Sequence, residues 1–436
     1  MHSLADLRAG RLAGARHLRL SEGLTGFPPE IFSLADTLEI LDLSGNRLTS
    51  LPDELPRLRR LRILFCSDNP FEVLPAVLGQ CPQLEMVGFK ANRIHTVPGE
   101  ALPPRLRWLI LTDNRLTALP PEIGRCTRLQ KLMLAGNRLT VLPPELAACR
   151  ALELLRIAAN RLEALPEWLL SMPRLAWLAF AGNPFSEAWA KGDEPVVEAL
   201  HWQALSLQRL LGQGASGHIH EALLTVGGNT SRLALKLFKG AVTSDGLPSS
   251  EIRAWLRAGR HPALIPVTGR LRGHPEGLDG LAMPLVEPSF RSLAGPPDFE
   301  TCTRDVYAAG TCLSPQEALA IARSIASAAA HLHAQGVNHG DLYAHNLLHG
   351  GGGAVFLGDF GAASCYPAGL EGLAGALQRL EVRAFGCLLE ELLTYQDEAA
   401  DPGGIRPRLA AWRDACLSEV CAERPLFAAL AQGLEV

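Results

Sequence analysis

The sequence lacks any stretch of about 18 uncharged apolar residues, the length that a membrane-spanning helix requires. Residues 1–8 also lack the apolar segment of a classical secretion signal. The chain has no run of Lys or Arg, and its formal net charge is −4. These absences give no support for a membrane or a nucleic-acid partner. We therefore expect a cytoplasmic protein whose partners are proteins or small molecules.

The 10 cysteines include no C-x-x-C pair, the spacing that is typical of metal-binding or redox-active thiols. Cys81, Cys126 and Cys149 recur at one phase of a repeated pattern, shortly before a leucine. We expect buried thiols in a reducing compartment, in preference to a structural metal site or disulfides.

The length and composition predict folded domains. The chain has 436 residues, of which 47% are hydrophobic and 20% are charged. This is enough for two or more domains, each with its own core.

The first part of the chain repeats the phrase L-x-x-L-x-L-x-x-N at steps of about 23 residues. Each copy ends on one of seven asparagines: Asn46, Asn69, Asn92, Asn114, Asn137, Asn160 and Asn183. Most copies continue into L-x-x-L-P, and a degenerate first copy fits a capping repeat. The pattern resembles the leucine-rich-repeat family from about Leu18 to Phe185. The resemblance implies a curved solenoid whose asparagine amides bond to the neighbouring backbone.

Strand alternation in the repeats predicts which side chains face outward. With Leu41 and Leu43 inside, the positions beside them face out. These outward positions are mostly apolar along the array: Ile63, Phe65, Met86, Trp108, Ile110, Met133, Leu154 and Trp177. A contiguous apolar patch marks an interaction surface, and a central aromatic residue is its natural anchor. We therefore predict a concave protein-binding face at these residues: Phe65, Trp108, Ile110, Met133 and Trp177.

From residue 205 onward the pattern changes to single motifs. Gly212, Gly214 and Gly217 form a G-x-G-x-x-G loop before a hairpin whose second strand carries Lys236. Glu251 follows on a helix that opens with serines. Alone, such a loop is more often an ordinary turn, and such a glutamate is more often a solvated side chain.

A later stretch gives these motifs a common meaning. Asp341 lies in His-Gly-Asp-Leu-Tyr-Ala-His-Asn, which ends at Asn346, and Asp359 opens Asp-Phe-Gly. One carboxylate to orient a hydroxyl, with an amide and a second carboxylate for Mg²⁺, is what phosphoryl transfer needs. The full set of motifs, in this order, resembles the protein-kinase family.

The resemblance implies a two-lobed fold that uses ATP and Mg²⁺. It implies that Asp341 orients the acceptor hydroxyl and that Asn346 and Asp359 hold the metal. Lys236, paired with Glu251, is expected to position the phosphates beneath the glycine loop. In the hinge, the resemblance makes Met283 the gatekeeper and gives Val286 the hydrogen bond to adenine.

Several residues depart from the family pattern. Gly340 stands where most members have arginine, Tyr343 where many have lysine, and Glu381 where aspartate is usual. The activation segment is short and contains no A-P-E. Because Gly340 cannot pair with a phosphate, we expect activity without phosphorylation of this segment, for example at Ser364.

Three functions stay open, and we favour an active protein kinase for Ser/Thr hydroxyls. The H-G-D motif also resembles the aminoglycoside and choline kinases, which are small-molecule phosphotransferases. The short activation segment would also fit a pseudokinase scaffold that binds proteins through its repeats. The predicted fold is multidomain: an α/β leucine-rich-repeat solenoid at 1–185, a linker at 186–204, and a two-lobed α+β kinase-like domain at 205–436.

Overall fold

The computed structural model describes residues 2–190, 195–214, 216–240, 242–243, 245–397, 401 and 403–435. The chain forms two compact units: Met1–Leu175 with Asn183–Phe185, and Ala176–Gly182 with Ser186–Val436. This division differs from the predicted one, because the segment Ala176–Gly182 belongs to the second unit although its sequence completes the last repeat. Residues 191–194 of the predicted linker lie outside the described residues.

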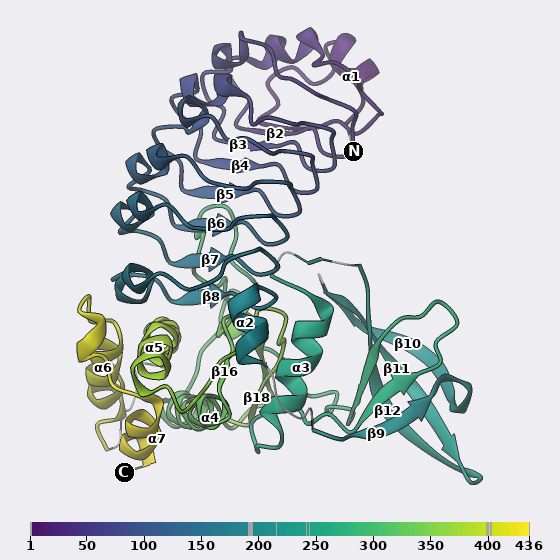
Figure 1. Ribbon diagram of the computed structural model, residues 1–436, viewed down its shortest axis with the longest axis vertical. Coiled ribbons are helices and arrows are strands. Elements are labelled where there is room, and N and C mark those ends of the chain that lie inside the picture. The colour runs from purple at the N-terminus through teal and green to yellow at the C-terminus, as the bar shows by residue number, and fades with distance from the viewer. Residues whose placement is uncertain are drawn as a thin grey trace. The chain divides into compact units, whose positions relative to one another are not determined.

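Short parallel strands, one from each repeat, form the sheet of the first unit (Figure 1). They are β1 (His17–Arg19), β2 (Ile40–Asp42), β3 (Ile63–Phe65), β4 (Met86–Gly88), β5 (Trp108–Ile110), β6 (Lys131–Met133) and β7 (Leu154–Arg156). Helix α1 (Leu4–Arg8) precedes them. Neighbouring strands pair in register, so that Leu41 lies beside Leu64, and both are buried. The predicted solenoid is confirmed.

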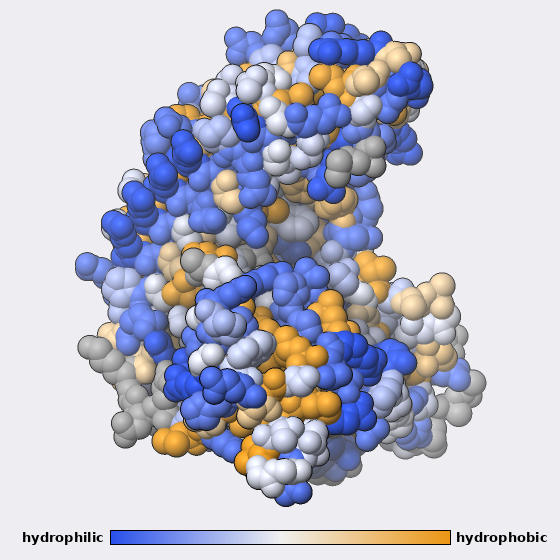
Figure 2. All heavy atoms as spheres, turned by 90° about the vertical axis from the view of Figure 1, so that its right-hand side faces the viewer, coloured by the Kyte–Doolittle hydropathy of each residue, from blue (hydrophilic) through white to orange (hydrophobic). Residues whose placement is uncertain are grey.

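Between the strands, the chain returns through short 3₁₀ helices. These are η1 (Pro29–Leu34), η2 (Leu55–Arg57), η3 (Ala76–Gln80), η4 (Gly99–Ala101), η5 (Pro121–Arg125), η6 (Pro144–Ala148) and η7 (Glu167–Ser171). Most of them begin directly after the proline of L-x-x-L-P, which fixes φ at a value suited to the start of a helix. Hydrophilic residues predominate on the side of the repeats that Figure 2 shows, as expected for an array with its leucines inside.

The repeat asparagines link each repeat to the one before it, as the sequence predicts. Asn137 donates from Nδ2 to the carbonyl oxygens of Leu111 (2.8 Å) and Leu134 (2.9 Å). Its Oδ1 accepts from the Leu116 amide at 3.0 Å. The other six make the same kind of bridge to the preceding repeat. The buried amide groups thereby replace the backbone pairing that the turns lack.

The outward face of the strands corrects part of the prediction. Phe65, Trp108, Ile110 and Met133 are half-buried. Other residues predicted to be exposed are buried: Ile63, Met86, Leu154 and Trp177. Ile63, Met86 and Leu154 belong to one row with Trp108 and Lys131. The strands of this row lie about 4.8 Å apart, so adjacent side chains cover one another. Trp177 has a different reason, because it packs inside the second unit.

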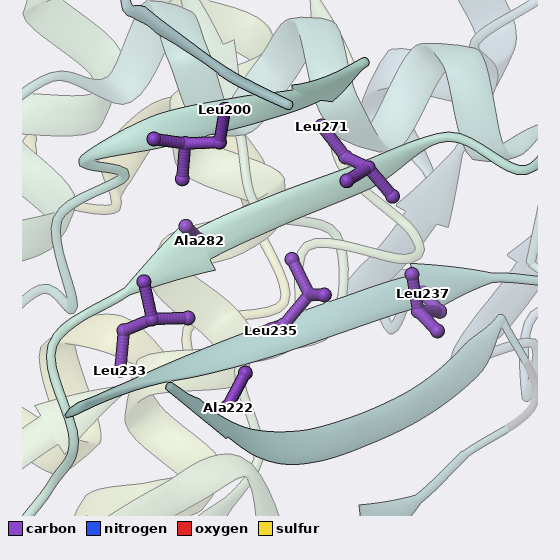
Figure 3. Packing of buried hydrophobic residues seen from close by; sticks show 7 residues of the cluster. All are labelled: Leu200, Ala222, Leu233, Leu235, Leu237, Leu271 and Ala282. Atoms are coloured by element: carbon purple, nitrogen blue, oxygen red, sulfur yellow. The ribbon is translucent and has the colours of Figure 1, made fainter. Parts of the chain in front are cut away.

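A mixed sheet with the strand order β10-β11-β12-β14-β13-β9 opens the second unit. Its strands are β9 (Glu198–His201), β10 (Leu205–Gln213), β11 (Gly217–Val226), β12 (Asn229–Phe238), β13 (Gly269–Arg272) and β14 (Gly280–Met283). Figure 3 shows the apolar side chains that the sheet buries, among them Leu200, Leu235 and Leu271. Strand β9 lies within the predicted linker, yet it pairs with β13 in parallel and contributes Leu200 to this core. The linker prediction is therefore wrong for β9.

Outside this sheet, the chain also forms β8 (Trp177–Ala179), α2 (Pro184–Trp189), η8 (Trp202–Ala204) and α3 (Pro248–Ala258). A mainly helical part follows. Its helices are α4 (Pro315–Ala334), η9 (Ala344–Asn346), α5 (Glu371–Thr394), α6 (Ile405–Cys416), η10 (Cys421–Glu423) and α7 (Phe427–Glu435). Its short strands are β15 (Arg291–Ser292), β16 (Val337–Asn338), β17 (Leu347–His349), β18 (Val355–Leu357) and β19 (Ser364–Cys365).

Helix α4 begins at a capping box and leads to the candidate site. Ser314 accepts from the Glu317 amide, and the Glu317 carboxylate accepts from the Ser314 amide, which completes a capping box.

Among the described residues, no helix is long and apolar enough to cross a membrane. Most of the 10 cysteines are buried, as the sequence predicts.

Candidate active site

The glycine loop connects two antiparallel strands of the sheet. Gly212 pairs with Ile219, and the Gly214 amide donates to the Gly217 carbonyl oxygen at 3.0 Å. A Cβ atom on Gly217 would collide with the carbonyl oxygen of Leu237 on β12. Glycine is therefore required at 217 so that β11 can lie close to β12.

Lys236 on β12 and Glu251 on α3 form a buried ion pair. The exposed fraction is 5% for Lys236 and 1% for Glu251. Burial raises the pKa of Glu251, Lys236 opposes that change, and the nearby charge of Asp359 adds to it. A buried pair of this kind fixes the ammonium group at one point of the sheet, and it holds α3 at a fixed distance from that sheet.

The loop after β16 brings Asp341 and Asn346 together. Asn346 donates from Nδ2 to the backbone oxygen of Asp341 and to its carboxylate, each at 2.8 Å. Both amide hydrogens point toward Asp341, so the amide oxygen is the end that can bind a cation. These bonds orient the Asp341 carboxylate within the loop.

Asp359 has a left-handed backbone conformation with φ of 52°, which is uncommon outside glycine. Its carboxylate accepts from the Gly361 amide at 3.1 Å. The next residue, Phe360, is fully buried between Trp255 of α3 and His339, with ring centroids 5.1 Å from each. Packing of this aromatic column fixes the backbone that carries Asp359.

A cavity of about 770 Å³ lies beside these residues. The predicted site residues that line it are Gly212, Met283, Val286, Asn346 and Asp359. Its wall is more apolar than polar, with Ile219, Ala234 and Leu348 among its lining residues. A pocket of this size, mostly apolar with a few polar groups, suits a nucleotide. Asp341 and the Lys236–Glu251 pair do not line the cavity itself.

Two of the polar residues that line the cavity form a donor set that fits Mg²⁺. Asn346 and Asp359 offer one amide and one carboxylate oxygen group. The described residues contain no cluster of three or more His, Cys, Asp or Glu side chains that could hold a metal alone. Mg²⁺ is commonly bound by one or two carboxylates together with substrate phosphates, so two protein ligands are sufficient.

Glu381 on α5 holds the loop that carries Asp341 through hydrogen bonds to its backbone. It is fully buried and accepts from the amides of His339 (3.2 Å) and Gly340 (2.6 Å). It also lies 2.8 Å from His333 Nε2. Burial alone would raise the pKa of Glu381, but the hydrogen bond and charge of His333, with further help from His339, hold the pKa below its usual value. His339 Nε2 donates to the Gly358 carbonyl oxygen at 2.9 Å, so this side chain also has a structural position in the loop.

Sequence reasoning missed two groups near the loop. His345 pairs with the buried Asp305 at 2.7 Å and lines the cavity. Burial lowers the pKa of His345, but the bond to Asp305 outweighs burial and raises it. Trp177 is the second: the sequence places it on the predicted protein-binding face, but its indole Nε1 donates to the Leu342 carbonyl oxygen at 3.0 Å. No local motif marks either residue, since both partners are distant in sequence.

Comparison with known protein families agrees with this architecture. The family described as protein tyrosine and serine/threonine kinase matches residues 205–368. Two leucine-rich-repeat families match residues 37–58 and 127–185. The chain is thus a fusion of leucine-rich repeats with a protein-kinase domain.

Individual relatives resemble only part of the chain. The chain is 34% identical over 119 residues to the human PH domain leucine-rich repeat-containing protein phosphatase 1. This alignment covers 26% of the chain and 7% of that protein. The mouse leucine-rich repeat and calponin homology domain-containing protein 1 is 33% identical over 99 residues, covering 23% of this chain and 14% of that protein. The chain also resembles a solved leucine-rich-repeat protein of Leptospira interrogans, at 28% sequence identity and a TM-score of 0.37. This match covers 42% of the chain and 53% of that protein.

Proposed function

We propose that this protein is an ATP-dependent kinase that phosphorylates Ser or Thr hydroxyls of proteins and binds a protein partner through its repeats. The observation that carries the proposal is that Asn346 and Asp359 line a nucleotide-sized cavity that Met283 and Val286 also line. Two metal ligands at that place would put the phosphates of ATP next to the Asp341 loop. The free, buried thiols support a reducing, cytoplasmic location.

In this proposal each side chain has one task. Val286 and Met283 receive the adenine, and the loop of Gly212, Gly214 and Gly217 covers the phosphates. Lys236 holds the phosphates from the sheet side, and its pairing with Glu251 keeps the ammonium in place.

Phosphoryl transfer then takes place beside the catalytic loop. Asn346 and Asp359 would hold Mg²⁺, which would supply positive charge to neutralise the reacting phosphates. Asp341 orients the acceptor hydroxyl and receives its proton as the new O–P bond forms and ADP leaves. Asn346 keeps the Asp341 carboxylate in position through its amide hydrogens.

The test is phosphotransfer by the purified full chain to a protein extract, with ATP labelled at the γ-phosphate and Mg²⁺ present. Labelled proteins containing phosphoserine or phosphothreonine would support the proposal. Asp359→Ala should abolish the labelling, because the variant loses a metal ligand. Absence of labelled protein and of ADP production by the wild-type chain would contradict the proposal, and phosphotyrosine alone would contradict its Ser/Thr part.

A further inference from the structure

The segment Ala176–Gly182 is packed into the second unit, where it touches the catalytic loop. The Trp177 ring is stacked on Tyr343 with a centroid distance of 4.2 Å and an interplanar angle of 7°. Its Nε1 donates to the Leu342 carbonyl oxygen, and its exposed fraction is only 1%. Leu342 and Tyr343 directly follow Asp341, so Trp177 contacts the backbone that carries the proposed catalytic carboxylate.

The next residue of the segment explains the glycine of the H-G-D motif. The Leu178 carbonyl oxygen accepts from Asn338 Nδ2 at 3.0 Å. Gly340 has a φ of 72°, and a Cβ atom there would lie 2.7 Å from the Leu178 carbonyl oxygen and 2.7 Å from that of Ala362. The segment and the loop lie too close together for any side chain at 340. This contact therefore leaves no room at position 340 for the arginine that is usual in the family.

The segment also binds the short stretch after Asp-Phe-Gly. Ser364 is fully buried, and its Oγ accepts from the amides of Phe180 (3.0 Å) and Ala181 (3.1 Å). Ser364 belongs to β19, which pairs with β16 at the start of the catalytic loop. In this conformation a phosphate on Ser364 has no room, and Oγ serves as a hydrogen-bond acceptor.

We propose that Ala176–Gly182 is a built-in positioning element that replaces a phosphorylated activation segment. Trp177 and Ser364 are its positioning residues: they hold the catalytic loop and β19 in the arrangement that phosphoryl transfer requires. The inference rests on the proposed kinase function. It identifies a source of activation that is permanent and lies within the chain itself, where many kinases use a phosphorylated residue of the activation segment.

Positioning fits the contacts better than blocking. The contacts of the segment go to Leu342, Asn338 and Ser364, which frame the loop. No residue of the segment is among the described residues that line the 770 Å³ cavity. Downstream of the segment, Glu187 forms an ion pair with Arg253 of α3 at 2.9 Å, and α3 also carries Glu251. The same stretch of chain thus supports both the catalytic loop and the helix of the Lys236–Glu251 pair.

The experiment compares full-length Trp177→Ala, Trp177→Phe and the control Trp168→Ala, which changes a half-buried tryptophan of η7. We expect Trp177→Ala to lower kcat about 100-fold, the scale of a displaced catalytic group. The KM for ATP should stay within about twofold, since the cavity is untouched. Trp177→Phe keeps a stacked ring and should recover much of kcat, and Trp168→Ala should match the wild type.

Ser364→Ala provides a second variant with a much smaller change. It leaves the Phe180 and Ala181 amides without their acceptor, and we expect a loss in kcat of about tenfold. Hydrogen exchange supplies a readout that does not depend on activity. Amides of residues 337–346 and 180–181 should exchange faster in Trp177→Ala and Ser364→Ala, while α6 and α7 keep their wild-type protection.

The outcomes separate this inference from the proposed function. An active wild-type chain with unchanged kcat and unchanged exchange in both variants overturns the inference and leaves the kinase function standing. Higher kcat in Trp177→Ala also overturns it, because the segment would then block the site. A wild-type chain that never turns over ATP contradicts the proposed function, and faster exchange in the variants would still support the role of the segment in holding the loop.

Discussion

At the scale of single residues, buried carboxylates have two opposite environments in the second unit. Glu381 is surrounded by donors from His333, His339 and Gly340, which stabilise its charged form. Glu391 lies close to the carboxylate of Asp305 and has fewer compensating donors. Glu391 accepts from the Asp305 amide (3.3 Å) and the Tyr307 hydroxyl (3.2 Å). Burial, followed by the charge of Asp305, raises the pKa of Glu391 to about 8.

This raised pKa gives a pH dependence with a definite sign. The folded chain keeps Glu391 protonated up to about pH 8, whereas the unfolded chain releases the proton near the ordinary glutamate pKa of 4.5. Stability from this group is therefore present at low pH and is lost as the pH rises through that window. In Glu391→Gln, the unfolding free energy should fall less between about pH 5 and pH 8 than in the wild type.

Denaturant unfolding of the second unit at a series of pH values measures this difference. Glu390→Gln is the matched control, because Glu390 is exposed on the same helix and should keep the wild-type profile. Parallel profiles for Glu391→Gln and the wild type would show that Glu391 is ionised throughout.

At the scale of elements, the repeat asparagines link each repeat of the first unit to the one before it by hydrogen bonds. Asn114 donates to the Phe89 and Leu111 carbonyl oxygens and accepts from the Ile94 amide. In Asn114→Ala these buried backbone groups lose their partner, at a cost of about 1–3 kcal/mol for each group left unpaired. We predict a clearly lower melting temperature for the repeats, measured by circular dichroism. Arg115→Ala, at the exposed neighbouring position, should melt like the wild type.

The elements also show how far the sequence could be interpreted. The repeat strands and their asparagine bridges were predictable, because each is set by local spacing that recurs along the array. Lys236 and Glu251 could be paired because family order supplied the partner. Strand β9 could not be predicted, since its pairing with β13 joins residues about 70 positions apart in a segment with little regular pattern.

Trp177 shows the limit of the outward-facing rule. Strand alternation states which side of a strand a side chain leaves from, but it does not state what covers that side. Trp108 and Trp177 occupy equivalent positions in their repeats, yet Trp108 is half-buried beside Lys131, whereas Trp177 is stacked on Tyr343. The glycine at 340 was visible as a departure from the family, but its cause, the Leu178 carbonyl oxygen, required the structure.

At the scale of the whole molecule, the repeat face is our predicted site for a protein partner. Lys131 Nζ lies 4.5 Å from the centroid of the Trp108 ring, and Trp108 Nε1 lies 3.4 Å from Met133 Sδ. These two contacts preorganise the Trp108 ring, and Phe65, Ile110 and Met133 are the other half-buried residues of the predicted face. Preorganised aromatic anchors contribute most to binding.

Trp108→Ala should preserve folding and change either the capture of protein partners or the basal phosphotransfer rate. Pull-downs and activity assays with wild-type and variant chains measure both. The control is the exposed Arg115→Ala variant, which should leave both readouts at their wild-type values. If Trp108→Ala also matches the wild type in both, another surface of the protein carries the interaction.

The central claim is that Asp341 acts on the acceptor hydroxyl while Asp359 and Asn346 act on the metal. Its most direct test is Mg·ATP turnover and Mg·ATP binding measured on the same preparation of Asp341→Asn, beside the exposed control Asp414→Asn. The account predicts that Asp341→Asn abolishes turnover and keeps nucleotide affinity within about twofold of the wild type, because the metal ligands remain. Wild-type turnover in Asp341→Asn would contradict it.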